Sequence, residues 1–206
     1  MAGHPGAGGP VMRAPVSLNL IDLDLAPVPA GHAAAHDAGG PAPARRSLAA
    51  RDALLEVLSD VLGHRPDEGA VRPGTPCDGV FFSEARRDER YLVGTSTWYP
   101  LGVECKSAVP GRPPPLVERL LPAGERREVA RLPAAARPLA FALCWCRMVA
   151  AVKACGAALD DAAHCMAATS QWAAVVAPGL VAGAAVLTER GIDVRWRTTA
   201  WEKDAS

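Results

Sequence analysis

The chain has 206 residues, enough for one domain of ordinary size or for two small halves that share a core. Its formal net charge is +0, so composition gives no reason to expect nucleic acid or an anionic membrane as a partner. Half of the residues are hydrophobic but only 5% are aromatic, because alanine supplies much of the apolar content. Together with 19 glycines and 19 prolines, this bias is typical of a GC-rich bacterial coding sequence.

The cysteines do not form a recognisable metal or disulfide pattern. No two of the six have C-x-x-C spacing, and Cys144 and Cys146, two residues apart, would point to opposite sides of a helix. The sequence therefore favours reduced, buried thiols over a zinc site. The six are Cys77, Cys105, Cys144, Cys146, Cys155 and Cys165.

No segment has the pattern of a membrane span or a leader. No uninterrupted apolar run reaches the ~18 residues that a span needs. Residues 1–14 lack the charged start and apolar core of a signal peptide, and they are so rich in glycine and proline that we predict a disordered tail. We therefore expect a cytoplasmic protein without a membrane partner.

The first half of the chain alternates predicted strands with one helix. Leucines alternating with polar residues predict a strand over residues 16–25. Residues 45–63 are predicted to form an amphipathic helix that Gly63 ends. Two apolar runs, residues 80–82 and 91–96, are predicted strands of a hairpin joined by the charged segment 83–90. The helix is expected to bury Leu48, Ala49, Leu54, Leu55, Leu58, Val61 and Leu62.

The second half begins with another predicted strand, residues 101–106, and a short helical patch over residues 116–121 and 124–132. Three strands are then predicted towards the C-terminus, over residues 172–176, 183–187 and 192–197. The last of them alternates cleanly, which favours an antiparallel strand.

Between these parts lies the longest helical pattern of the chain, residues 139–159. Pro138 precedes it, and Gly156 is suited to a helix end. One apolar face is expected to comprise Phe141, Trp145, Met148, Val152 and Cys155. A second ridge, with residues four apart, comprises Trp145, Val149 and Lys153.

Residues 145–156 of this helix resemble the signature helix of the phosphopantetheinyl transferase superfamily, W-x-x-K-E-A-x-x-K-A-x-G. The chain reads W-C-R-M-V-A-A-V-K-A-C-G at these positions. The tryptophan, both alanines, the second lysine and the glycine match. Met148 and Val149 replace the first lysine and the glutamate, so the spacing is kept and the acid is lost.

The order of the predicted elements also resembles the two-lobed members of that superfamily, the type that activates surfactin synthetase. Residues 16–25 and 45–63 take the places of its opening strand and of its helix rich in Arg and Leu. Gly-Thr-Pro at 74–76 stands where the family has Gly-Lys-Pro, and residues 102–106 stand at its strand motif Gly-(Val/Ile)-Asp-x-Glu. The resemblance covers residues 16–200.

The resemblance implies an α+β fold of two pseudo-symmetric lobes, each a helix packed on a small antiparallel sheet. After the tail at residues 1–14, we expect the first lobe over residues 15–99. The second lobe, residues 100–206, carries the signature helix. We expect the chain to be a monomer.

The resemblance also implies an activity. Members of the superfamily move 4′-phosphopantetheine from coenzyme A to a serine of an acyl or peptidyl carrier protein, and an Mg²⁺ ion held by acidic side chains neutralises the charge at the phosphoryl group. The ligand positions hold Glu104, Lys106 and Val149 in this chain. Since Mg²⁺ needs hard oxygen ligands in near-octahedral geometry, we predict no metal site.

Six residues are candidates for a site. Glu104 and Lys153 are the candidate catalytic residues; the alternative for Lys153 is a lysine on the helix surface. Lys106 can pair with a diphosphate or with Glu104. In the family, one strand of the first lobe ends in Ser-His, which this chain lacks. An arginine pair near that place can grip phosphates bidentately, unless it belongs to a solvated charged loop. The candidates for substrate binding are Arg86, Arg87, Lys106 and Trp145.

Three functions are compatible with these motifs. The favoured one is a degenerate transferase of bacterial polyketide or nonribosomal peptide biosynthesis, which keeps its cleft for coenzyme A or carrier protein. The second is an active transferase with an altered site. The third is a repurposed, metal-independent enzyme that acts on a polyketide-like or carrier-bound substrate in the same cleft.

Overall fold

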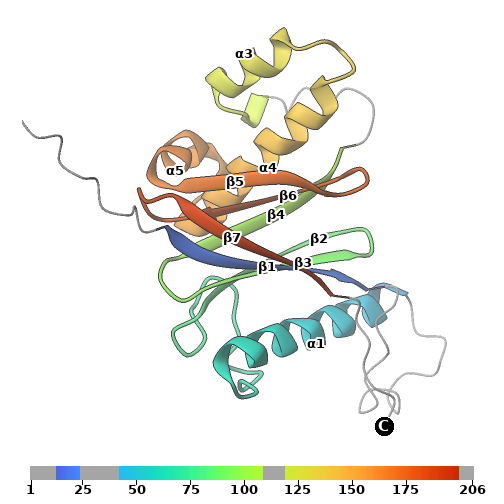
Figure 1. The fold of residues 1–206 in the computed structure, drawn as a ribbon, viewed down its shortest axis with the longest axis vertical. Coiled ribbons are helices and arrows are strands. Elements are labelled where there is room, and N and C mark those ends of the chain that lie inside the picture. Colours follow the sequence, from blue (N-terminus) through green and yellow to red (C-terminus); the bar gives the residue numbers. More distant parts are fainter. Residues whose placement is uncertain (1–12, 24–41, 109–118, 200–206) are drawn as a thin grey trace, which may run out of the picture.

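The computed structural model describes residues 13–23, 42–108 and 119–199. Its strands form two sheets that face each other, and a long helix covers the outer face of each sheet (Figure 1). The predicted α+β fold class is therefore confirmed. Residues 1–12 of the predicted tail lie outside the described residues, whereas residue 14 begins the first strand.

The first sheet has the strand order β2-β3-β1-β7. It consists of β1 (Ala14–Asp22), β2 (Phe81–Arg87), β3 (Arg90–Ser96) and β7 (Ile192–Thr199). The pairs β1–β3 and β2–β3 are antiparallel, but β7 runs parallel to β1. The prediction of an antiparallel last strand is therefore wrong, because alternation reports a half-buried face and carries no information about strand direction.

The charged connection predicted over residues 83–90 is also wrong. β2 continues to Arg87, and only Asp88 and Glu89 separate it from β3. β2 is an edge strand, where alternate side chains reach solvent while the backbone still pairs with its neighbour. Charged residues are therefore compatible with a strand here. Asp88 has φ of 54°, a left-handed conformation that aspartate tolerates in tight turns.

The second sheet has the order β4-β6-β5, with both pairs antiparallel. Its strands are β4 (Leu101–Ser107), β5 (Ser170–Ala177) and β6 (Leu180–Val186). The helices on this side are α3 (Ala123–Arg131), α4 (Arg137–Cys155) and α5 (Ala162–Ala168), with a short 3₁₀ helix, η1 (Leu159–Asp161), before α5. The predicted strands and the predicted long helix of this half are confirmed.

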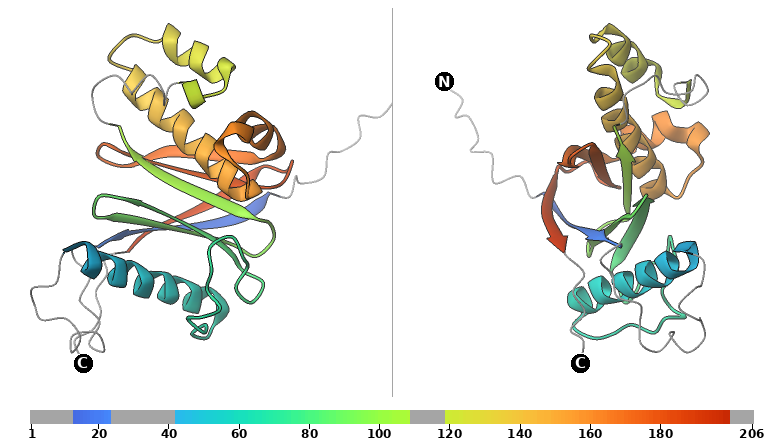
Figure 2. Two further views of the ribbon diagram at one scale, coloured as in Figure 1. Left: turned by 180° about the vertical axis from the view of Figure 1, so that it is seen from behind. Right: turned by 90° about the vertical axis from the view of Figure 1, so that its right-hand side faces the viewer.

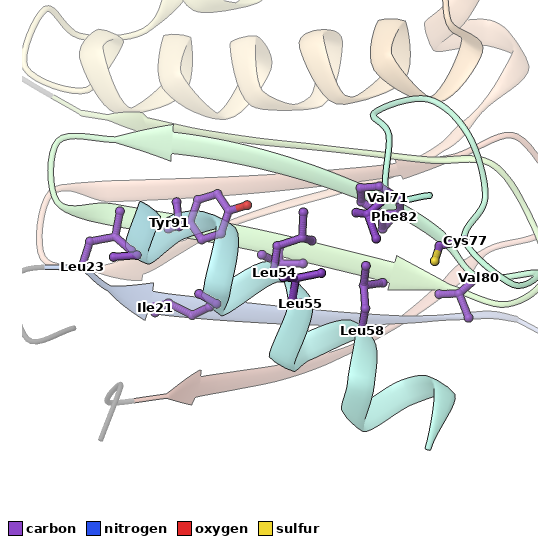
Figure 3. Close-up of a cluster of buried hydrophobic side chains, with 14 residues drawn as sticks. Ile21, Leu23, Leu54, Leu55, Leu58, Val71, Cys77, Val80, Phe82 and Tyr91 are labelled. Atoms are coloured by element: carbon purple, nitrogen blue, oxygen red, sulfur yellow. The ribbon is translucent and has the colours of Figure 1, made fainter. Parts of the chain in front are cut away.

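Helix α1 (Ala42–Leu62) packs on the first sheet through the predicted apolar stripe. Figure 3 shows Leu54, Leu55 and Leu58 of α1 in one cluster with Ile21 and Tyr91 of the strands, and all five are buried. Leu48 and Leu62 of the stripe are half-buried, and Val61 is exposed, at 40%. Three residues on from Leu58, it lies about 60° round the helix and so falls at the rim of the stripe.

Helix α4 approaches the second sheet closely because two glycines lie beneath it. A Cβ atom at Gly102 would stand 1.9 Å from the backbone oxygen of Ala150, and one at Gly183 would stand 2.8 Å from the backbone of Cys146. The side chains of α4 that meet the sheet at these points are also small. The helix ends at Gly156, which has φ of 63°, as its left-handed C-terminal position favours.

By length and composition, α4 is apolar enough to cross a membrane, although half of its apolar window is buried in the fold. The core helix of a soluble protein meets the same criterion. The apolar face predicted for α4 is buried in part: Phe141, Met148 and Val152 are buried, whereas Trp145 and Cys155 are half-buried.

All six cysteines are free thiols, and five of them are buried, as predicted. Burial raises the pKa of Cys105 to about 12, and the charge of Glu104 adds to the shift. Burial also raises the pKa of Cys155, the half-buried one, to about 11, with a further contribution from the neighbouring Cys165 thiol. Few thiolates are therefore available near neutral pH.

Because only the thiolate reacts, we expect native protein treated with iodoacetamide near neutral pH to gain label slowly, and only at Cys155. In denaturant all six cysteines should be labelled. Intact-mass measurements and peptide mapping check this result. Rapid labelling of Cys105 or Cys146 in the native protein would contradict the burial described above.

Candidate functional site

The two sheets meet where β2 lies beside β4, and a cavity opens at this seam. The Ser83 hydroxyl accepts a hydrogen bond from the Val103 N–H at 3.1 Å, and Arg87 Nε donates to Ser107 Oγ at 3.2 Å. The cavity has a volume of about 300 Å³. It is lined by Glu84, Ala85, Arg86, Tyr91, Glu104 and Lys153.

Strand alternation and the glycine contact bring Glu104 and Lys153 together. Leu101, Val103 and Cys105 pack between the sheets, so Glu104 lies on the opposite face of β4, the one that carries α4. Gly102 is on this same face and lies under α4, with its absent Cβ 2.8 Å from the Lys153 Cβ. Lys153, the second lysine of the signature pattern, therefore lies next to Glu104, the acid of the strand motif.

The Lys153 ammonium is enclosed by three oxygen atoms. It lies 3.0 Å from Glu104 Oε2 and donates to the backbone oxygens of Val103 at 2.9 Å and Glu84 at 3.1 Å. Val103 and Glu104 belong to β4, whereas Glu84 belongs to β2. The lysine therefore links the two sheets, and all three of its donor positions have acceptors.

Glu104 is held on both oxygens. Its Oε1 accepts the N–H of Cys105 at 3.2 Å, and its Oε2 contacts the Lys153 ammonium. Its side chain is 18% exposed, so the carboxylate reaches the cavity but is neutralised by its partner. The sequence prediction that these two residues share a site is consistent with this geometry.

Two further residues of the cavity, Glu84 and Tyr91, are not among the candidates that the sequence indicated. The Tyr91 hydroxyl donates a hydrogen bond to Glu84 Oε2, and Arg86 lies over the Tyr91 ring at 6.0 Å from its centroid. Burial and then the Glu84 charge raise the pKa of Tyr91, so the phenol stays protonated and remains a donor. Reading residues 83–87 as a strand would have placed Glu84 and Arg86 on one face.

Arg86 and Arg87 do not act as a pair. Successive strand residues point to opposite faces, and only Arg86 lines the cavity. Arg87 instead bonds Ser107 across the seam and lies 3.6 Å from Asp88. The structure therefore places Arg86 and Arg87 apart, although the sequence suggested that they bind phosphate together.

Lys106 lies over two aromatic rings of α4. Its ammonium is 5.1 Å from the centroid of Trp145 and 5.7 Å from that of Phe141, and the two rings stack 6.0 Å apart. Such cation–π contacts contribute about 0.5–1 kcal/mol at exposed sites. Lys106 and Trp145 are therefore in contact with each other, two residues along β4 from Glu104. The Glu104 carboxylate pairs with Lys153 and not with Lys106, which the sequence offered as a partner.

The residues of this site do not fit a magnesium ion. Within the described part of the chain, no group of three or more His, Cys, Asp or Glu side chains gathers in metal-binding geometry. At the three positions that the resemblance assigns to the metal, Glu104 bonds to Lys153, Lys106 is a cation and Val149 packs against apolar neighbours. The cavity has one further carboxylate, Glu84, which accepts from the Tyr91 hydroxyl. Two carboxylates that already have partners are too few for a cation that requires several oxygen ligands.

The sequence matches no protein-family model and no curated protein.

Proposed function

We propose that the chain is a phosphopantetheinyl transferase-like protein that binds coenzyme A or a carrier protein at the seam cavity and does not carry out transfer. The observation that carries this proposal is the Lys153 ammonium, bound by Glu104 Oε2 and two backbone oxygens. Of the three positions that the resemblance assigns to the metal, only Glu104 is a carboxylate, and the Lys153 ammonium binds it.

The order of elements supports the resemblance. β1, α1, β2 and β3 run strand, helix, hairpin. β4, α4, β5 and β6 repeat this order, with α3 added before α4 and with η1 and α5 added after it. In each half the first strand pairs antiparallel with the last, which gives the orders β2-β3-β1 and β5-β6-β4. On this basis we infer two pseudo-symmetric lobes, residues 15–99 and 100–206, while β7 follows the second repeat and joins the first sheet.

The charges at the cavity favour binding over transfer. Phosphoryl transfer requires neutralisation of charge that develops on the phosphoryl oxygens. The Lys153 ammonium is already saturated by its three acceptors, so it has no donor left for a transferred group. Arg86, on the cavity wall, and Lys106, on the α4 side of β4, remain as cations for the diphosphate of coenzyme A.

The test is incubation with coenzyme A, Mg²⁺ and several apo carrier proteins, followed by intact-mass spectrometry of the carriers. We expect no phosphopantetheine mass gain. A gain that is lost in Glu104→Ala would overturn the proposal and establish the alternative, an active transferase with an altered site. A known active transferase of the same superfamily, run in parallel, verifies that the carriers are competent.

A metal-independent enzyme is the second candidate, and the Glu84–Tyr91 pair favours it. The Glu84 carboxylate lies on the cavity wall and is oriented by the Tyr91 hydroxyl, as a general base requires. This candidate gains support if neither coenzyme A nor carrier protein binds, because the cavity would then serve another substrate. Under either candidate we propose a cytoplasmic, monomeric protein of bacterial polyketide or nonribosomal peptide biosynthesis.

A further inference from the structure

A second cavity lies between α3 and α5, apart from the seam cavity. It has a volume of about 380 Å³ and shares no lining residue with the seam cavity. Both helices pack against α4 (Figure 2). The volume lies within the range of about 300–1,000 Å³ that is typical of small-molecule sites.

One wall of this cavity is apolar and comes from α5. Ala162 and Cys165 of this helix are buried in the cluster that contains α4. Ala163, Met166 and Ala167 follow them at helical spacing, so they share the neighbouring face, and all three line the cavity. The two alanines are small and leave space on either side of the methionine.

The other wall comes from α3 and carries two carboxylates. Glu125 and Glu128 are three residues apart, so they lie on one side of the helix, and both line the cavity. Glu125 already has partners: Arg147 Nη2 lies 2.9 and 2.8 Å from its two oxygens, and Cys144 Sγ donates to it at 2.8 Å. Arg147 therefore neutralises Glu125 and holds it in place.

Glu128 supplies the remaining charge of this wall. Among the described residues, the ion pairs of acidic side chains involve other residues, and Glu128 is exposed. The nearest basic residues in the sequence, Arg127 and Arg131, are exposed and do not line the cavity. The described lining thus combines an apolar wall with one negative charge and includes no basic side chain.

We propose that this cavity binds a small organic amine, with its ammonium group at Glu128 and its apolar body against Met166. The ammonium would donate charge-assisted hydrogen bonds to the carboxylate, and the apolar body would fill the space beside Ala163 and Ala167. An anion fits less well, because both titratable side chains of the lining are acids. The site does not depend on what the seam cavity binds.

The probes are three straight-chain compounds of equal length that differ in charge: hexylammonium, 1-hexanol and hexanoate. Binding to the full chain is measured near neutral pH by titration with saturation-transfer NMR. We expect hexylammonium to bind about tenfold more tightly than 1-hexanol, and we expect no binding of hexanoate. Hexanoate also tests the alternative that the free N–H groups in the first turn of α3 attract an anion.

Two variants separate the charge from the apolar wall. Glu128→Gln should lower the affinity for hexylammonium about tenfold and leave the affinity for 1-hexanol unchanged. Ala163→Leu, at an exposed position of α5, should fill the cavity and weaken the binding of both compounds. The matched control is Glu189→Gln, which removes the charge of another exposed acid outside the cavity lining and should bind like the wild type.

The proposal is overturned if hexylammonium shows no saturable binding, if 1-hexanol or hexanoate binds as tightly, or if Glu128→Gln and Glu189→Gln lose the same affinity. It is also overturned if Nα-acetyl-lysine methylamide binds more tightly than hexylammonium with the same dependence on Glu128, because the cavity would then receive a lysine side chain of a partner protein. Circular dichroism checks that each variant is folded. Glu128→Lys is a second variant at the decisive position and should abolish hexylammonium binding.

Discussion

Gly102→Ala is expected to destabilise the protein by about 3 kcal/mol or more. The new methyl group would stand 1.9 Å from the Ala150 backbone oxygen and 2.7 Å from the Ala154 backbone nitrogen. Backbone atoms in a helix cannot move aside singly, so α4 would have to lift from β4. With typical stabilities of about 5–15 kcal/mol, we expect poor solubility and a much lower Tm.

Two other glycines provide a graded comparison by urea denaturation. Gly183→Ala should cost less than Gly102→Ala, because its methyl group would meet Cys146 at 2.8 Å. Gly124→Ala, in the first turn of α3 with no atom within 4 Å, should be neutral or stabilising by up to about 1 kcal/mol. A Gly102→Ala protein as stable as the wild type would contradict the close contact between α4 and β4.

Lys153→Ala is the second large expected effect, a loss of about 2 kcal/mol in the free energy of unfolding. The change leaves the half-buried Glu104 carboxylate without its cation and leaves the backbone oxygens of Glu84 and Val103 without a donor. The figure is smaller than for a fully buried ion pair, because the Lys153 side chain is 35% exposed.

A double-mutant cycle separates the cost of the unpaired Glu104 carboxylate from the cost of the two lost backbone hydrogen bonds. Lys153→Met/Glu104→Gln should be more stable than Lys153→Met, since it removes the uncompensated carboxylate. Lys106→Met is the matched control, because this lysine contacts only aromatic rings in the interactions described above, and it should cost less than 1 kcal/mol, about the value of an exposed cation–π contact. Equal losses for Lys153→Met and Lys106→Met would show that Lys153 does not tie the sheets together.

Sequence patterns predicted the parts of the fold that depend on local periodicity. The apolar spacing around Met148 fixed α4, and Gly156 marked its end, as the structure confirms. Gly102 and Gly183 carried no comparable signal, because the need for a glycine there arises from α4 crossing strands that are distant in sequence. The sequence predicted the wrong direction for β7 for a related reason, since strand pairing is set by the path of the whole chain.

The candidate site was predictable in part. The resemblance points to Glu104 and Lys153 as candidate catalytic residues, and their contact in the structure follows from strand alternation and helix packing. Glu84 and Tyr91 were missed because the charge of residues 83–87 was interpreted as a loop, whereas an edge strand accommodates such residues. The three-oxygen environment of Lys153 depends on β2 lying beside β4, a contact between the halves that no local pattern encodes.

The most direct test of the central claim is titration calorimetry of the full chain with coenzyme A, once in Mg²⁺ and once in EDTA. If the Lys153 ammonium stands where a transferase would hold its metal, coenzyme A should bind with the same dissociation constant in both buffers. Pantetheine without the diphosphate should bind more weakly, and Arg86→Ala should reduce that difference, because Lys106 remains as the second cation. Coenzyme A binding that requires Mg²⁺ would contradict the account, and so would the absence of binding both to coenzyme A and to the apo carrier proteins.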